Sequence, residues 1–202
     1  MLVILVNGLP GSGKTTVARA LGRELALPVF SKDDLKETLA DVLDRPDGVG
    51  EREWSRRLGA AAGESMWTLL ARAGRGAVLE SPWLAPLRPL VMDGLSRAGV
   101  EAGSAREVWC EVPPELARSR YERRVRHLIH YDDEVGDERW REWAAGARPL
   151  GLGPVYSLDT SKIVDISRLA ALLILREDLP GEASFIIRGD RDDRDDRGRA
   201  GG

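Results

Sequence analysis

Short apolar segments alternate with longer amphipathic stretches along most of the chain. The apolar segments cover residues 2–6, 28–31, 77–80, 107–112 and 154–158, and each has the length of a strand buried on both faces. After the first segment, Val17, Leu21 and Leu25 recur at the spacing of one helix face. This alternation predicts an α/β fold in which a doubly wound, five-stranded parallel sheet is flanked by helices.

The amphipathic stretches between these strands predict the helices. Residues 33–44 and about 51–73 have helical periodicity, and the breaker Arg45-Pro46-Asp47-Gly48 separates them. Further helices are predicted over residues 89–97, from 113 through 124 or beyond, and over 166–176. We expect a single domain over residues 1–180, in which the helical region at about 45–75 binds substrate. Residues 188–202 alternate in charge without apolar side chains and are expected to be disordered.

Composition narrows the classes of protein that fit this pattern. The chain has 202 residues and a formal net charge of −3, which gives no global attraction to nucleic acid or to an anionic membrane. Its single cysteine, Cys110, excludes an intrachain disulfide framework. No apolar stretch approaches the roughly 20 residues that span a bilayer, and the early first strand leaves no room for a signal peptide. We therefore expect a cytoplasmic protein that has no membrane partner.

A glycine-rich segment follows the first predicted strand and opens the first predicted helix. Residues 8–15 have the pattern G-x-x-x-x-G-K-[ST] of a nucleotide-binding P-loop. Its glycines allow successive N–H groups to turn inward as an anion-binding nest at a helix N-terminus. The lysine adds a cation for the β- and γ-phosphates, and the threonine hydroxyl is placed to ligate Mg²⁺. The predicted nucleotide-binding residues here are Gly8, Leu9, Pro10, Gly11, Ser12, Gly13, Lys14, Thr15 and Thr16, with Thr15 also a metal ligand.

Two carboxylates are predicted to lie beside this loop, because each comes at the carboxyl end of a strand. Asp33, after the second strand, either accepts the proton of an attacking hydroxyl or caps the helix that begins there. Glu80, at the end of the third strand, is either a second group near Mg²⁺ or a simple strand-end charge. Together with the loop, Asp33 is typical of a phosphoryl-transfer site.

The motifs Gly-Leu-Pro-Gly-Ser-Gly-Lys-Thr-Thr and Ser-Lys-Asp-Asp-Leu-Lys resemble those of small P-loop kinases of the adenylate kinase-like group. This group includes chloramphenicol phosphotransferase, gluconate kinase and polynucleotide kinase-like AAA-type ATP-binding proteins. The resemblance implies that ATP is the phosphate donor and that Asp33 is the catalytic base. It also implies that Lys36, where an arginine is expected, assists at the active site.

An arginine-rich segment after the fourth strand extends the resemblance. Residues 112–116, with the arginines that follow, are similar to the helix that leads into the lid of adenylate kinases. Arg120 and Arg124 correspond to a pair that stacks on adenine and contacts phosphates, and residues 125–136 would form the lid. Without the resemblance these arginines would be interpreted as a solvated basic helix face. Thr160 matches an Asp-Thr turn whose backbone lies near the adenine, and its alternative is an ordinary polar turn.

Two residue pairs lie outside these motifs. His127 and His130 are interpreted as structural or lid-surface residues, since no third and fourth ligands cluster with them as zinc requires. Trp140 and Trp143 are three residues apart and are expected to share a face, which favours core packing over substrate stacking.

The combined motifs predict an ATP-dependent kinase that phosphorylates a hydroxyl of a small molecule. Its predicted catalytic residues are Lys14, Asp33 and Arg124, and its predicted Mg²⁺ ligands are Thr15 and Glu80. Two alternatives stay open. One is a polynucleotide 5′-hydroxyl kinase, for which nucleic acid is a possible but less favoured partner. The other is a nucleotide-dependent switch or ATPase without a small-molecule acceptor.

Overall fold

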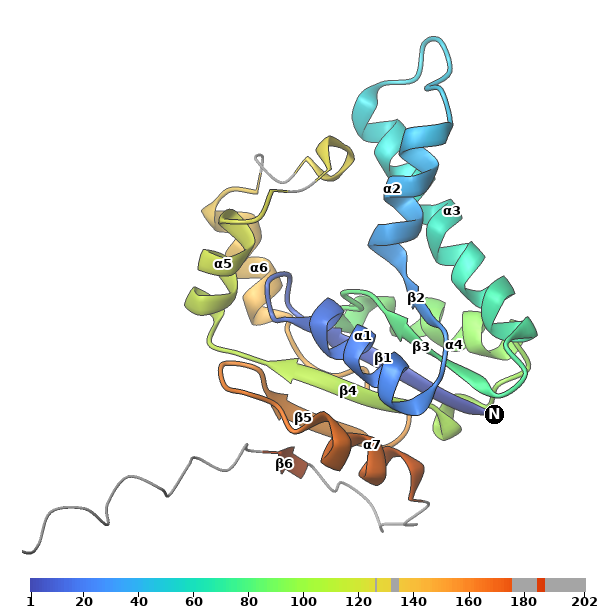
Figure 1. Cartoon of the computed structure of the whole chain (residues 1–202). Coiled ribbons are helices and arrows are strands. Elements are labelled where there is room, and N and C mark those ends of the chain that lie inside the picture. Colours follow the sequence, from blue (N-terminus) through green and yellow to red (C-terminus); the bar gives the residue numbers. More distant parts are fainter. Residues whose placement is uncertain (126, 132–134, 176–184, 188–202) are drawn as a thin grey trace, which may run out of the picture.

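A parallel sheet of six strands runs through the centre of the molecule in the order β2-β3-β1-β4-β5-β6 (Figure 1). The computed structural model describes residues 1–125, 127–131, 135–175 and 185–187. The strands are β1 (Leu2–Gly8), β2 (Val29–Ser31), β3 (Gly76–Glu80), β4 (Arg106–Glu111), β5 (Val155–Asp159) and β6 (Phe185–Ile187). The first five are the predicted strands, shifted by no more than two residues at either end, so the predicted parallel α/β fold is confirmed. Strand β6 was not predicted and pairs with β5.

Helices flank both faces of this sheet. Their bounds are α1 (Lys14–Leu25), α2 (Lys32–Val42), α3 (Glu51–Arg72), α4 (Arg88–Arg97), α5 (Pro114–Glu122), α6 (Asp137–Ala145) and α7 (Ile166–Ile174). Helix α6 was not predicted, and α5 ends at Glu122 rather than running through Arg124, which lies beyond the helix. The predicted tail at 188–202 lies outside the described residues. Within the described ranges, no helix is both long and apolar enough to cross a membrane.

The central strand β1 divides the apolar core into two layers. Val3 and Leu5 are buried against α3 and α4, where the core includes Trp67 and Leu95. Side chains alternate along a strand, so Ile4 and Val6 face the opposite layer, formed by α1 and α7. This burial on both faces explains why the strand is apolar throughout, as expected for a parallel sheet covered on both sides.

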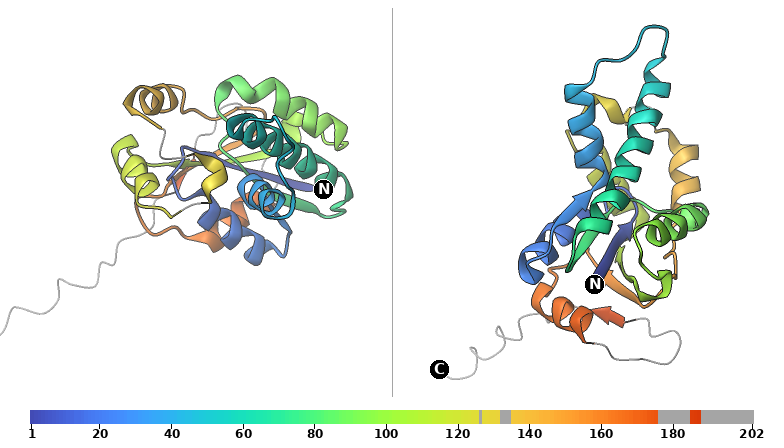
Figure 2. Two further views of the ribbon diagram at one scale, coloured as in Figure 1. Left: turned by 90° about the horizontal axis from the view of Figure 1, so that it is seen from above. Right: turned by 90° about the vertical axis from the view of Figure 1, so that its right-hand side faces the viewer.

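The strand register brings the carboxyl ends of four strands, β2, β3, β1 and β4, to one edge of the sheet. Ser31 pairs with Glu80, Glu80 pairs with Val6, and Gly8 pairs with Cys110. Helices α2 and α3 stand out from this edge as an antiparallel pair, joined by residues 43–50 (Figure 2). The ends of β2 and β3 therefore lie beside the end of β1, where the loop to α1 begins.

A buried polar network supports the end of β1, where the loop at residues 8–15 begins. Asn7 Nδ2 donates to Glu107 Oε1 and to the Trp83 carbonyl, both at 2.9 Å, while Asn7 Oδ1 accepts from the Gly8 amide at 2.8 Å. Glu107 is 1% exposed, and it also accepts from the amides of residues 150 and 151 at 2.9 and 3.0 Å. The network fixes β1, β4 and the chain after β3 relative to one another.

We expect Glu107→Ala to lower the free energy of unfolding by about 2–5 kcal/mol, because three donors would lose their acceptor in a buried position. Urea denaturation followed by circular dichroism measures the change. The matched control is Glu111→Ala, since Glu111 is exposed on the same strand, and its effect should stay within about 0.5 kcal/mol. Equal losses in the two variants would contradict a special role for the network.

Candidate active site

Residues 8–15 form the loop that joins β1 to α1, as the sequence predicted. Gly8, Gly11 and Gly13 have φ angles of 146°, 80° and 84°, values that residues with a side chain rarely adopt. Gly13 is the N-cap of α1 and makes no side-chain capping bond, so the first amides of the helix are left for a ligand. A Cβ on Gly11 would lie 2.1 Å from the Ala117 carbonyl oxygen, which shows how closely the loop packs on α5.

Lys14 is the first residue of α1 and is buried. Its Nζ donates to the Leu9 carbonyl at 2.8 Å, across the loop. Burial lowers the pKa of the Lys14 ammonium, and the nearby Glu80 carboxylate acts in the opposite direction. A phosphate anion in the loop would favour the charged form in the same way as Glu80 does.

Glu80 is buried at the end of β3 and accepts a hydrogen bond from Ser31 Oγ at 2.7 Å. Burial raises the pKa of the Glu80 carboxyl, while Lys14 and the Ser31 hydroxyl oppose that shift. Lys14 and Glu80 are therefore two buried, opposite charges that stabilise each other. A carboxylate in this position has the oxygen chemistry that Mg²⁺ prefers.

Asp33 does not cap α2. The cap is Ser31, whose Oγ accepts from the Asp34 amide at 3.4 Å, and Asp33 occupies the second helical position. Asp33 instead lines a cavity of about 310 Å³ that also contains Lys14, Glu80 and Arg124 on its walls. The capping role thus belongs to Ser31, and Asp33 lines the cavity beside the loop.

Two cavities flank the loop. The cavity of about 310 Å³ lies on the α2 side and is called the second cavity; the first cavity, of about 480 Å³, lies on the α5 and α7 side. The second cavity brings together Pro10, Lys14, Thr15, Asp33, Glu80 and Arg124 from the sequence prediction. The first brings together Thr16, Arg120, Arg124 and Thr160. Gly11, Gly13 and Arg124 line both, whereas Gly8, Leu9 and Ser12 are buried in the loop and line neither.

Arg120 and Thr160 connect the walls of the first cavity. Both terminal nitrogens of Arg120 donate to the Thr160 carbonyl, at 3.2 and 3.3 Å, and Thr160 Oγ1 donates to the Ser12 carbonyl at 2.7 Å. The rest of the wall includes Val17 and Ile163, which sequence reasoning missed as site residues. Apolar side chains like these carry no chemical signal of their own, so the sequence alone indicates only a buried helix face.

Helix α6 contributes two residues to the second cavity that the sequence did not indicate as site residues. Arg139 lies over the Trp143 ring at 5.4 Å from its centroid, and both side chains line the cavity. Trp140 and Trp143 are in contact, with ring centroids 6.0 Å apart. Trp140 is buried in the core, as expected, whereas Trp143 lines a wall.

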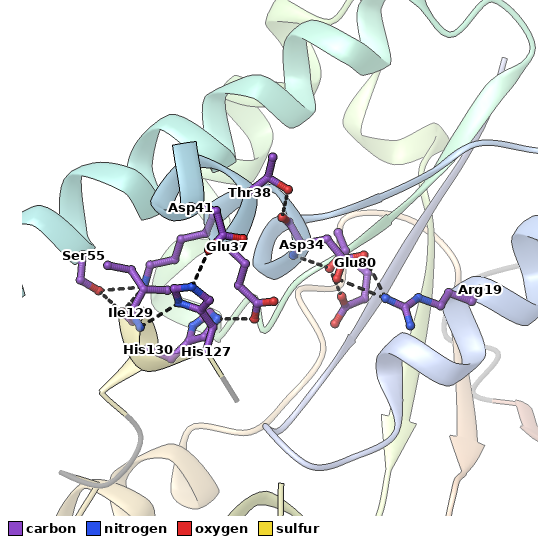
Figure 3. Close-up of polar contacts among 12 residues, drawn as sticks. Arg19, Asp34, Glu37, Thr38, Asp41, Ser55, Glu80, His127, Ile129 and His130 are labelled. Carbon is purple, nitrogen blue, oxygen red and sulfur yellow. Dashed lines mark hydrogen bonds and ion pairs between the residues drawn. The ribbon is translucent and has the colours of Figure 1, made fainter. Parts of the chain in front are cut away.

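The histidines of the predicted lid point towards α2 (Figure 3). His130 contacts Glu37 and His127 contacts Asp41. Across the described part of the chain, no group of three or more His, Cys, Asp or Glu side chains is arranged to hold a metal ion. Of the predicted lid at 125–136, residues 126 and 132–134 lie outside the described residues.

Known proteins are similar to this chain in sequence or in fold. Residues 3–150 match the protein family described as an AAA domain. A shikimate kinase from Symbiobacterium thermophilum is 32% identical over 160 residues, which cover 74% of this chain and 80% of that protein. The crystal structure of a presumed kinase from Chloroflexus aurantiacus is 28% identical and has a TM-score of 0.70 over 85% of this chain and 96% of that one. A sugar kinase from Janibacter, 17% identical with a TM-score of 0.55 over 85% and 93%, shares the fold.

Proposed function

Because the chain belongs to the AAA domain family of small P-loop kinases, we propose that it transfers the γ-phosphate of ATP to a hydroxyl group of a small molecule. The observation that carries this proposal is the second cavity, whose walls include Lys14, Asp33 and Arg124. A loop that binds phosphates, a carboxylate that binds a hydroxyl and a cation between them are the parts that phosphoryl transfer needs.

In this proposal the nucleotide enters from the first cavity. Its base lies against the apolar wall and the Arg120 guanidinium, near the Thr160 backbone. Lys14 and the amides of the loop hold the β- and γ-phosphates. Thr15 and Glu80 line the second cavity, on the other side of the loop, and offer oxygen ligands for Mg²⁺, which when bound would neutralise charge on the phosphates.

The acceptor enters from the second cavity. Asp33 orients its hydroxyl and accepts the proton as the new oxygen–phosphorus bond forms and the γ-phosphoryl group leaves ADP. Arg124 lines both cavities and steadies the phosphoryl group as it passes between them. We further propose that residues 1–180 act as one kinase domain and that the helical region at about 45–75, which contains α3, provides acceptor selectivity.

A transfer screen with γ-labelled ATP tests the proposal. The acceptors are nucleosides, sugars, aminocyclitols and 5′-hydroxyl oligonucleotides, and we expect labelled product from one class of small molecule. Label on oligonucleotides alone would assign a polynucleotide kinase instead. Acceptor-independent hydrolysis without any labelled product would indicate a switch or ATPase.

Arg120→Ala should raise the dissociation constant for ATP about tenfold, because the base loses a planar cation and the Thr160 carbonyl loses its donors. Binding of a fluorescent ATP analogue measures this constant. Arg123→Ala is the matched control, since Arg123 caps the same helix and its Nε contacts only the Ser119 carbonyl among the bonds described for it. A similar loss of affinity in both variants would indicate a general charge effect rather than a contact with the base.

A further inference from the structure

Residues 127–131 lie against the helical pair α2 and α3 (Figure 3). The Ile129 carbonyl accepts from Ser55 Oγ at 2.7 Å and from Lys36 Nζ at 3.2 Å. Lys36 Nζ also donates to Ser55 Oγ at 2.8 Å. These three groups form a closed triangle in which one carbonyl of the segment is held by one side chain from each helix.

Two further contacts hold the same segment along α2. His130 Nε2 lies 2.7 Å from Glu37 Oε1, and the His130 side chain is only 6% exposed. His127 Nε2 lies 3.0 Å from Asp41 Oδ1. Glu37 and Asp41 are four residues apart and so share one face of α2, which matches the spacing of the two imidazoles.

These contacts form part of the wall of the space in front of Asp33. Lys36 and His130 both line the second cavity. His130 and Ser55 also line a third cavity of about 360 Å³, which shares Tyr121, Arg139 and Trp143 with the second. His130 of the segment therefore contributes to the walls of both cavities, next to side chains of α2 and α3.

Lys36, which the family resemblance implied at the active site, lines the second cavity and also contacts the segment. Its ammonium donates to Ser55 and to the Ile129 carbonyl, which lie on the helical pair and on the segment. A lysine suits this task, because a compact ammonium on a flexible stem can donate in several directions at once.

We propose that Lys36, Ser55 and Glu37 are positioning residues that fix residues 127–131 as a wall of the acceptor cavity and so control acceptor binding. The effect on acceptor binding rests on the proposed kinase function, whereas the holding of the segment does not. Charge-assisted hydrogen bonds and a buried carbonyl shared by two donors make the contact specific to this arrangement. Loss of one donor should loosen the wall without changing the loop at residues 8–15.

Hydrogen exchange at the Ile129 amide tests the holding of the segment in the full chain without any substrate. Ser55→Ala should raise the exchange rate about tenfold, because the Ile129 carbonyl loses its shorter bond. Ser55→Thr retains a hydroxyl and should stay near the wild-type rate. Ser65→Ala is the matched control, since Ser65 lies on the same helix and donates to the Ala61 carbonyl.

Steady-state kinetics test the consequence for the reaction. Ser55→Ala and Glu37→Gln should each raise the KM for the acceptor about tenfold while the KM for ATP changes less than about twofold. The same variants should hydrolyse ATP without acceptor about fivefold faster, because a loosened wall admits water.

Different results overturn different statements. An unchanged Ile129 exchange rate in both Ser55→Ala and Glu37→Gln overturns the proposal that these residues hold the segment. Faster exchange with an unchanged acceptor KM and unchanged ATP hydrolysis overturns the link to the cavity. Failure of the wild-type protein to phosphorylate any acceptor overturns the proposed function alone, since the exchange and hydrolysis measurements need no acceptor.

Discussion

Asp33→Asn is expected to lower kcat for phosphoryl transfer by about 10²–10⁴-fold and to leave the dissociation constant for ATP within about twofold of wild type. Asparagine keeps the size of the side chain and can still hydrogen-bond a hydroxyl, but it cannot accept the proton. The substitution should not disturb α2, because the helix is capped by Ser31. Rapid-quench measurement of a single turnover separates the chemical step from nucleotide binding.

The neighbouring residue supplies the control for this prediction. Asp34 is not among the residues that line the second cavity, and it pairs at the surface with Arg19, whose Nη2 lies 3.1 Å from its carboxylate. Exposed ion pairs of this kind contribute little to stability, so Asp34→Asn should turn over as wild type. Wild-type turnover in Asp33→Asn would remove Asp33 from the mechanism. An equal loss in both variants would assign the effect to the charge of the helix N-terminus instead.

The parts of the site that were predicted correctly are those whose signal lies in neighbouring residues. The loop at residues 8–15 follows a strand and opens a helix, and all three features are visible within about 25 residues of sequence. The five strands are continuous apolar runs because both of their faces are buried, and Ile4 with Leu5 shows this most directly. Burial on both faces is a strong constraint on sequence, so it is easily recognised.

Helix α6 was missed because it has little apolar surface to reveal it. Its sequence, DERWREWAA, is mostly charged, and its packing depends on Trp140 and Trp143 against Tyr121 of α5. That contact joins residues about 20 positions apart, so the hydrophobic periodicity of a short segment cannot reveal it. The end of α5 at Glu122 was missed for a similar reason, since the arginines after it are as compatible with a helix as those before it.

The roles of polar residues with two possible uses also needed the structure. Sequence position left Asp33 as either base or cap, and only the bond from the Asp34 amide to Ser31 assigns the cap. Lys36 contacts Ile129, 93 positions further along the chain. Hydrogen bonds over such separations depend on how the helical pair and the chain after α5 are placed. Composition and residue spacing do not reveal that placement.

Gly11→Ala is expected to weaken ATP binding about 10²-fold, because the methyl group meets the backbone of α5. The φ angle of 80° strains any side chain at this position, and the new Cβ would lie 2.1 Å from the Ala117 carbonyl oxygen. Neither the oxygen nor the loop can yield without moving the amides that face the phosphates. Isothermal titration calorimetry with ATP measures the loss.

Gly13→Ala separates the two causes of that effect. Gly13 has nearly the same φ angle, 84°, but a Cβ there would have Thr160 Cβ as its nearest neighbour, at an ordinary 3.8 Å. The Gly13→Ala variant should therefore have the backbone strain without the steric clash, and its affinity for ATP should fall about tenfold. A loss as large as that of Gly11→Ala would mean that left-handed backbone, rather than clearance from α5, is what the loop requires of its glycines. A clearly smaller loss would show that the position of α5 sets the shape of the phosphate site, and with it the place of Arg124 just beyond that helix.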